Sequence, residues 1–174
     1  PEQWLEDASE AISDMDFLVK ELTDIQVRVD NLPSIYEVGI SKLRERHLDR
    51  LLSIRCIISK ASKVEPAYDI AAYECLRCGH ITLVPQPKYS DKLMEPFAGC
   101  ENDSCGKKGP FNQVNEGAVK YDHQYLIVQE PLEELRGSQP DFLTVSCRDE
   151  LTGIVNPGER VIITGILKGA TRSN

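Results

Sequence analysis

The sequence has no apolar stretch long enough to cross a membrane, and its N-terminus shows no signal or transit peptide. These absences argue against a membrane or secreted protein, so we expect an intracellular one with no membrane partner. A Gly-x4-Gly-Lys-Ser/Thr phosphate loop is also missing, which excludes a P-loop ATPase motor from these 174 residues. Aromatic residues are scarce, at 6%, so base stacking should add little to any binding of nucleic acid.

Basic residues are too few to indicate a general nucleic-acid binder, since the net charge is −8. Their distribution is uneven, however. Residues 1–38 carry 10 acids and two bases, whereas residues 39–64 carry seven bases and two acids. The sequence therefore predicts one basic segment in an acidic protein, which is either a surface for a polyanion or a solvated helix face.

Four of the six cysteines form two close pairs, Cys75-x2-Cys78 and Cys100-x4-Cys105, with 21 residues between the pairs. Two tight turns that each deliver two thiolates are typical of a closed four-cysteine zinc site, in which the metal supports structure and keeps no open position for chemistry. Gly79 and Gly106 follow the pairs and let the backbone bend toward the sulfurs. The alternatives are two disulfides or free thiols, and the absence of a secretory signal favours zinc.

The other cysteines, Cys56 and Cys147, lie in apolar strand patterns and are expected to be small buried hydrophobes. His47 is expected to pack, because four sulfurs already complete the zinc site. A zinc deaminase would need an open metal position and a His-x-Glu element, and no Glu follows His80 at that step. No catalytic residue is predicted.

Apolar residues at steps of three and four predict a helix over residues 3–22, whose apolar stripe needs a partner surface. Alternation predicts a strand near residues 25–29, and a short helix is expected near residues 40–51. The remaining predicted elements are strands over residues 52–59, 67–74, 111–129, 142–147 and 160–167. Asn156-Pro157-Gly158-Glu159 has Pro and Gly where a type II turn requires them.

Short, closely spaced strands without alternating helices favour a small β-barrel over a doubly wound sheet. A five-stranded Greek-key barrel with basic strands is the OB-fold pattern, which often binds single-stranded nucleic acid. The expected fold is therefore mainly β: an OB-fold Greek-key barrel with an inserted four-cysteine zinc module and an N-terminal helix.

Several segments together resemble the N-terminal half of the minichromosome maintenance (MCM) replicative helicases, and the archaeal members most of all. In order they are Leu43 to Pro66, Tyr73 to His80, Gln129 to Pro140, and Asn156 to Leu167. The resemblance implies the last helix of a helical subdomain at residues 1–24, an OB-fold over residues 25–72 and 112–174, and a zinc module over residues 73–111. Because the chain starts at Pro1 and not at Met, we expect a piece of a longer protein.

In the resembled family this region forms a hexameric collar around DNA, and the zinc modules support a double hexamer. The implied function is to grip single-stranded DNA without sequence preference during replication. The implied partners are DNA, further copies of the chain and other replication proteins. ATP and Mg²⁺ would belong only to the motor domain of the parent helicase. The implied location is the cytoplasm or nucleoid of an archaeon, or the nucleus of a eukaryote.

The candidate zinc ligands are Cys75, Cys78, Cys100 and Cys105. The candidate DNA-binding residues, placed by the strand pattern, are Arg55, Lys60 and Lys63, followed by Lys120, Lys168 and Arg172. The resemblance also implies a loop that reports the state of the collar to the motor, which here holds Gln129, Glu130, Pro131, Gln139 and Pro140.

The sequence departs from the family pattern at two positions. The family usually has Gly where Cys56 stands and Arg where Asp141 stands. The family's basic hairpin would start near Arg172, so we expect it to be absent or only begun there. A ring scaffold, or a diverged homologue with little DNA binding, is therefore the alternative function. A transcription-type zinc ribbon would not explain the matches on both sides of the insertion.

Overall fold

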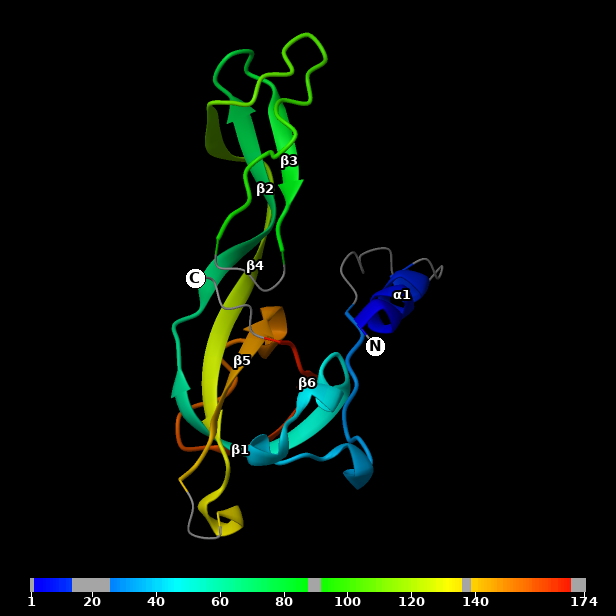
Figure 1. Ribbon diagram of the computed structural model, residues 1–174, viewed down its shortest axis with the longest axis vertical. Helices are drawn as coiled ribbons and strands as arrows, with labels where there is room; N and C mark the ends of the chain where they lie inside the picture. The colour runs from blue at the N-terminus through cyan, green and yellow to red at the C-terminus, as the bar shows by residue number, and fades with distance from the viewer. Residues whose placement is uncertain (1, 14–25, 88–91, 136–138, 170–174) are drawn as a thin grey trace. The chain divides into compact units, whose positions relative to one another are not determined.

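The structure is a computed structural model that describes residues 2–13, 26–87, 92–135 and 139–169 (Figure 1). It is mainly β, with one α-helix, α1 (Glu2–Ser13). The strands are β1 (Leu51–Ala61), β2 (Glu65–Cys75), β3 (Ile81–Pro85), β4 (Phe111–Gln129), β5 (Phe142–Arg148) and β6 (Arg160–Ile166). They pair in the order β3-β2-β4-β1-β6, and β5 pairs with β4. No helix among these residues is long and apolar enough to span a membrane.

The chain divides into two compact units, which are described separately. The first unit comprises residues 1–61, 126–145 and 156–174, and the second comprises residues 62–125 and 146–155. The first therefore contains α1, β1 and β6, whereas the second contains β2, β3 and most of β4. Strands β4 and β5 contribute residues to both.

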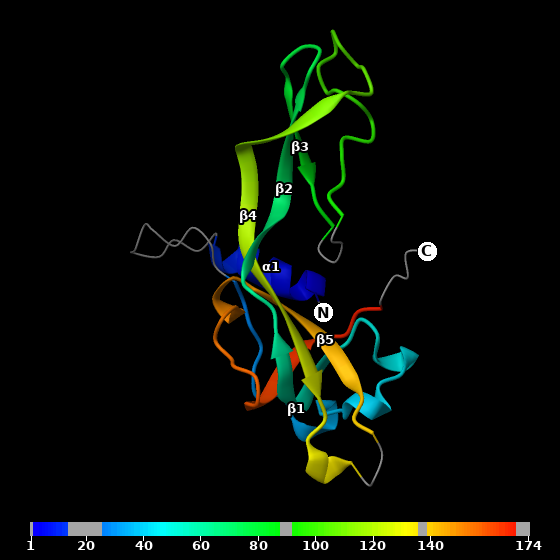
Figure 2. The same ribbon diagram turned by 90° about the vertical axis from the view of Figure 1, so that its left-hand side faces the viewer.

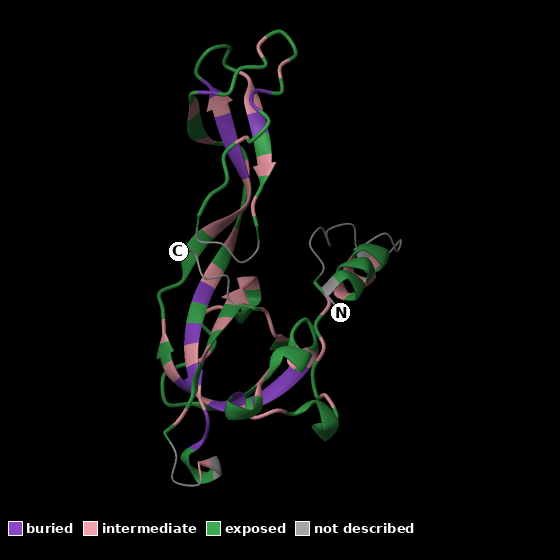
Figure 3. Cartoon of the chain, viewed as in Figure 1, coloured by how far each residue is buried: buried purple, intermediate pink, exposed green. Residues whose placement is uncertain are grey.

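Strand β1 supplies the core of the first unit. Its inward-facing side chains are Leu52, Ile54, Cys56 and Ile58, all buried (Figure 3). The strand pairs antiparallel with β6 from Leu51 to Ile57 and with the end of β4 from Ile57 to Ala61. A bulge between Ile58 and Lys60 shifts the register with β4. Because a bulge reverses which face later side chains point to, Lys60 is exposed although it has the parity of the core residues.

Strands β2 and β3 lie side by side and antiparallel in the second unit, and β4 pairs with β2 along its other edge (Figures 1 and 2). Ala71, Ala72 and Tyr73 of β2 are buried. After β3, the side chain of Gln86 bonds the Met94 backbone in both directions, accepting from its N–H at 2.7 Å and donating to its carbonyl at 3.0 Å. This pair of bonds holds the loop after residue 91 against the end of β3.

Most of the predicted elements are confirmed. Helix α1 begins one residue before the predicted helix 3–22 and confirms its first part, and residues 14–22 lie outside the described residues. The strands predicted over residues 52–59, 67–74, 111–129, 142–147 and 160–167 correspond to β1, β2, β4, β5 and β6. The predicted type II turn is present, with Gly158 at a φ of 93° and the Glu159 N–H bonded to the Asn156 carbonyl at 3.2 Å. Cys56 is fully buried, as expected, and burial raises its pKa to about 11.

Two predicted elements are wrong. Residues 26–30 form no strand, because the Val27 N–H bonds the Ser9 hydroxyl instead of a neighbouring strand. The short helix near residues 40–51 is replaced by two 3₁₀ turns, at Ile40–Lys42 and Glu45–His47, after which β1 begins. A 3₁₀ turn aligns residues three apart, so it satisfies the same apolar spacing. Strand β3 was not predicted.

His47 has a more specific role than general packing. Its side chain is only half-buried, and its Nδ1 accepts the backbone N–H of Arg44 at 2.9 Å, which caps the second 3₁₀ turn. Desolvation, and then the positive charges of Arg46, Arg50 and Arg44, lower the pKa of this histidine. Both effects favour the neutral ring, which is the form that can accept the Arg44 bond.

Candidate metal centre and nucleic-acid interface

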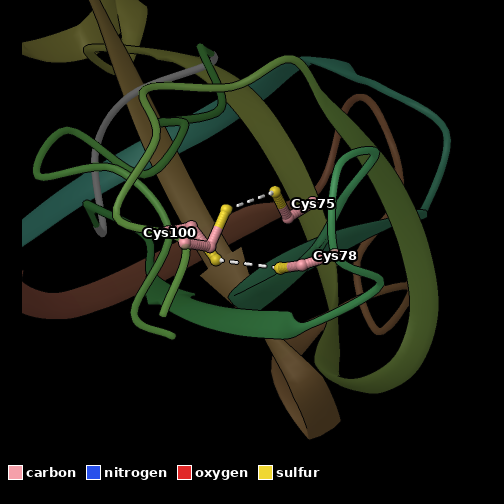
Figure 4. Close-up of side chains that lie close together, drawn as sticks. Cys75, Cys78 and Cys100 are labelled. Carbon is pink, nitrogen blue, oxygen red and sulfur yellow. Dashed lines mark hydrogen bonds between the residues drawn. The ribbon is translucent and has the colours of Figure 1, made fainter. Parts of the chain in front are cut away.

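The four paired cysteines converge on one point in the second unit. Figure 4 shows the thiols of Cys75, Cys78 and Cys100 pointing toward one another. The sulfurs of Cys75 and Cys105 are 3.9 Å apart, and those of Cys78 and Cys100 are 3.5 Å apart. All four sulfurs lie within 4.8 Å of one another, and none forms a disulfide. The two pairs that are separate in the sequence therefore form a single cluster in the fold.

Two similar backbone turns present the sulfurs. In the first, the Gly79 N–H bonds the Cys75 carbonyl at 2.8 Å, and in the second the Gly106 N–H bonds the Asn102 carbonyl at 2.9 Å. Both glycines have positive φ, 71° for Gly79 and 53° for Gly106, a region that disfavours other residues. Glycine therefore suits the backbone of both turns, whereas the amides of Arg77 and Asn102 are the ones that bond the sulfurs of Cys75 and Cys100.

The strands bring the two turns together. Cys75 is the last residue of β2 and pairs with Phe111 at the start of β4. The Leu76 N–H bonds the Pro110 carbonyl at 3.1 Å, and the Arg77 Nε bonds the Gly109 carbonyl at 3.0 Å. These bonds fix the end of the second cysteine loop beside the first turn.

The donor set fits a tetrahedral thiolate metal. With metal–sulfur distances of about 2.3 Å, a regular tetrahedron separates its sulfurs by about 3.8 Å, close to the observed spacing. The Arg77 backbone hydrogen bond lowers the pKa of the Cys75 thiol to about 7, against the opposing effect of desolvation. The pKa of Cys100 is raised in spite of the Asn102 backbone bond, because desolvation and the neighbouring sulfurs disfavour a further negative charge. A bound cation would remove that repulsion, so the four cysteines could hold a metal ion.

The first-ranked DNA-binding candidates all lie at the surface. Arg55 and Lys60 are exposed residues of β1 in the first unit, and Lys63 is exposed in the second unit. Arg55 is not a free cation. Its Nη2 lies 3.1 Å from one carboxylate oxygen of Glu37 and 3.2 Å from the other. Backbone bonding next to Glu37, from the Val38 N–H to the Ser53 carbonyl at 3.0 Å, holds this partner beside β1.

The second-ranked candidates also have partners. Lys120 donates to Asn115 Oδ1 at 2.8 Å and lies 4.8 Å from the ring centroid of Tyr68. Lys168 pairs with Asp49 at 3.0 Å. Arg172 lies outside the described residues.

Sequence reasoning missed the environment of Arg55. A pocket of about 450 Å³ in the first unit is lined by Arg55, Lys42, Glu37 and Glu130, among others. No local sequence signal links these residues, since Glu37 precedes Arg55 by 18 positions.

Glu130 was expected only as part of a loop, but its side chain is buried, with 4% exposed. Its Oε1 accepts both the backbone N–H of Ser41, at 3.0 Å, and the Ser41 hydroxyl, at 2.9 Å. A Cβ at Gly39 would come within 2.8 Å of the same oxygen. The carboxylate therefore connects the end of β4 to the 3₁₀ turn at Ile40–Lys42. Gly39, which has no side chain, leaves space for this carboxylate.

The antiparallel strands and the inserted cysteines define an OB-fold domain with a four-cysteine cluster that could hold a metal ion. Residues 39–171 match the sequence profile of the MCM OB domain, so the chain belongs to this family. The predicted fold class and the resemblance to the N-terminal region of MCM proteins are confirmed.

Known proteins similar to the chain come from both archaea and eukaryotes. It is 28% identical to the minichromosome maintenance protein MCM of Saccharolobus solfataricus over 85% of this chain and 21% of that protein. It is 29% identical to the DNA replication licensing factor mcm2 of Schizosaccharomyces pombe over 84% of this chain and 17% of that protein. The crystal structure of the N-terminal domain of an archaeal MCM matches with a TM-score of 0.74 and 28% identity, covering 99% of this chain and 68% of that one. The chain thus spans about a fifth or less of these two curated relatives.

Proposed function

We propose that this chain is the DNA-gripping part of the N-terminal collar of an MCM replicative helicase, and that it holds single-stranded DNA without sequence preference. Membership of the MCM OB domain family carries the proposal. Exposed Arg55, Lys60 and Lys63 support it, because phosphate neutralisation by Lys and Arg supplies most of the affinity of such binding. Binding should weaken steeply with salt, which a titration with oligo(dT) measures.

We propose that the four cysteines bind one structural Zn²⁺ per chain. Four thiolates would complete a tetrahedral shell and leave no position for a water or substrate, so the metal would hold the second unit's loop together. Elemental analysis of freshly purified protein should find one zinc per chain, and finding none would remove the proposal. We also propose that the chain divides into the last helix of a helical subdomain at residues 1–24, an OB-fold over residues 25–72 and 112–174, and the zinc module over residues 73–111.

A ring scaffold that binds DNA poorly is the second candidate function. Two observations favour it: Glu37 and Asp49 already neutralise Arg55 and Lys168, and Asp141 stands where the family usually has Arg. Single-strand binding that is weak and insensitive to salt would support the scaffold over the DNA grip.

The proposed partners are single-stranded DNA, other copies of the chain in a hexamer or double hexamer, and other replication proteins. Light scattering should report monomers at low concentration and hexamers as concentration or single-stranded DNA rises. Six linked sites would raise avidity and offset weak binding per subunit. A stable two-fold dimer would count against the ring. The loop from Gln129 to Pro140 is the proposed contact that reports the collar's state to the motor.

A further inference from the structure

Three of the few aromatic side chains lie together on one strand. Tyr121, His123 and Tyr125 alternate along β4 in the second unit and form a continuous row of edge-on ring contacts, here named the aromatic row. The ring centroids of Tyr121 and His123 are 6.1 Å apart, and those of His123 and Tyr125 are 4.3 Å apart. Alternate residues of a strand share one face, so the row lies on one face of the sheet.

The face that carries the row is partly accessible. Tyr125 is 37% exposed, and Tyr121 and His123 are half-buried. On the opposite face Gln124 is buried behind Tyr125, whereas Asp122 is exposed. Gln124 bonds the Ser62 carbonyl at 2.8 Å and the Gly153 N–H at 2.9 Å, which fixes the strand from behind. The row is therefore a surface feature on a rigid support.

Strand β5 fixes two of the three rings. Arg148 of β5 lies 3.9 Å from the Tyr121 ring centroid and donates to its hydroxyl at 2.8 Å. Ser146 Oγ lies 2.8 Å from His123 Nε2. A ring held in place loses little entropy when a planar ligand lies on it, which is the arrangement that a stacking surface requires.

The charges around the row point to the uncharged part of a nucleotide as its ligand. Glu65 of β2 stands opposite His123 in the register, and Asp69 lies 4.0 Å from Arg148. The Glu65 carboxylate repels phosphate, and Asp69 offsets the charge of Arg148 at the Tyr121 end, so the row suits the backbone of DNA poorly. Lys63 follows Ser62, whose backbone N–H and hydroxyl both bond the Tyr125 backbone. A phosphate could thus pair with Lys63 while its base contacts the end of the row.

We propose that the aromatic row is a stacking site for the bases of single-stranded DNA, with Tyr125 as the main contact. The proposal rests on the proposed function and adds to it a site that binds bases instead of phosphates. It requires no base preference, because every base has a flat face that can stack on an aromatic ring.

The test compares oligo(dT) with an oligonucleotide of equal length whose central sites lack bases. The full chain should bind the oligonucleotide that retains its bases at least about fivefold more tightly, the lower end of what one stacked base contributes. Tyr125→Leu should abolish this preference and leave the salt slope unchanged. Tyr36→Leu is the matched control, since Tyr36 is an exposed tyrosine of the first unit, and it should keep the preference.

A spectroscopic readout separates stacking from a structural effect of the substitution. The sequence has one tryptophan, Trp4, so the double variant W4F/Y125W carries its only indole in the row. The fluorescence of this indole should be quenched by oligo(dT) and much less by the oligonucleotide without bases. Equal affinity for the two oligonucleotides in the full chain, or equal quenching, would overturn the stacking site and leave the phosphate grip standing. An absence of salt-dependent binding to either one would overturn both.

Discussion

Glu37 should act as an internal competitor of DNA at Arg55. Both of its carboxylate oxygens lie within 3.2 Å of the Arg55 Nη2, so a phosphate must displace this carboxylate before it can pair with the guanidinium. Replacing Glu37 with Gln keeps the shape of the side chain and removes its charge. We therefore expect Glu37→Gln to bind single-stranded DNA more tightly than the unmodified chain.

The size of the effect follows from the exposure of the pair. The side chains are 53% exposed for Arg55 and 34% for Glu37, and an exposed pair of this kind contributes about 0–1 kcal/mol. Releasing Arg55 should thus raise affinity by up to about fivefold at low salt. If the freed arginine pairs with one further phosphate, the slope of log affinity against log salt should steepen by about 0.7.

Fluorescence anisotropy with labelled oligo(dT) over a range of salt concentrations measures both quantities. Glu101→Gln is the control, because it removes the same charge from a loop of the second unit. The gain from Glu37→Gln should also vanish when Arg55 is replaced by Ala, which closes a double-mutant cycle. A gain no larger than that of Glu101→Gln, or one that persists without Arg55, would refute the competition.

Three further outcomes are expected. Replacing any one of Cys75, Cys78, Cys100 or Cys105 with Ser should release zinc and unfold residues 75–105 while the far-ultraviolet circular dichroism of the strands is largely kept; full zinc retention in such a variant would contradict the ligand set. The Arg160 hydrogen bond lowers the pKa of Glu133, so the pair should add stability above the ordinary glutamate pKa and lose it as the pH falls through the lowered value. Thermal melts of Glu133→Gln should lack that acid-dependent loss, and identical pH profiles would exclude the effect. Gly39→Ala should lower the free energy of unfolding in urea by about 1–3 kcal/mol, because the new methyl group would come within 2.8 Å of the Glu130 carboxylate held by Ser41. An unchanged urea midpoint would show that the Glu130 side chain can move away without cost.

The elements that the sequence predicted correctly are those whose signal is local. Alternation along β1 reflects its buried side, and the Pro157–Gly158 pair reflects the backbone geometry of one turn. The cysteine pairs were readable for the same reason, since the two cysteines of each pair lie close together in the chain. Cys75 and Cys78 share one turn with Gly79, and Cys105 and Gly106 share the turn that begins at Asn102. Three-residue apolar spacing is ambiguous, and it led to an α-helix where the chain forms 3₁₀ turns.

What the sequence could not predict depends on contacts between distant residues. The pairing of Arg55 with Glu37, and of Glu130 with Ser41 across 89 positions, exists only in the folded chain. The low content of Phe, Trp and Tyr describes the average of the chain, but it does not reveal that two tyrosines and a histidine gather on β4. The bulge in β1 shows the same limit, because the sequence names Lys60 as a surface residue without indicating the change of register next to it.

The central proposal is that Arg55 and Lys60 of β1, together with Lys63, bind the phosphates of single-stranded DNA. The most direct test is the salt dependence of oligo(dT) binding by the chain and by a triple variant with Arg55, Lys60 and Lys63 replaced by Ala. The proposal predicts weaker binding by the triple variant, with a log–log slope shallower by about 0.7 for each phosphate that is no longer neutralised. A triple variant that keeps both the affinity and the slope of the unmodified chain would contradict it.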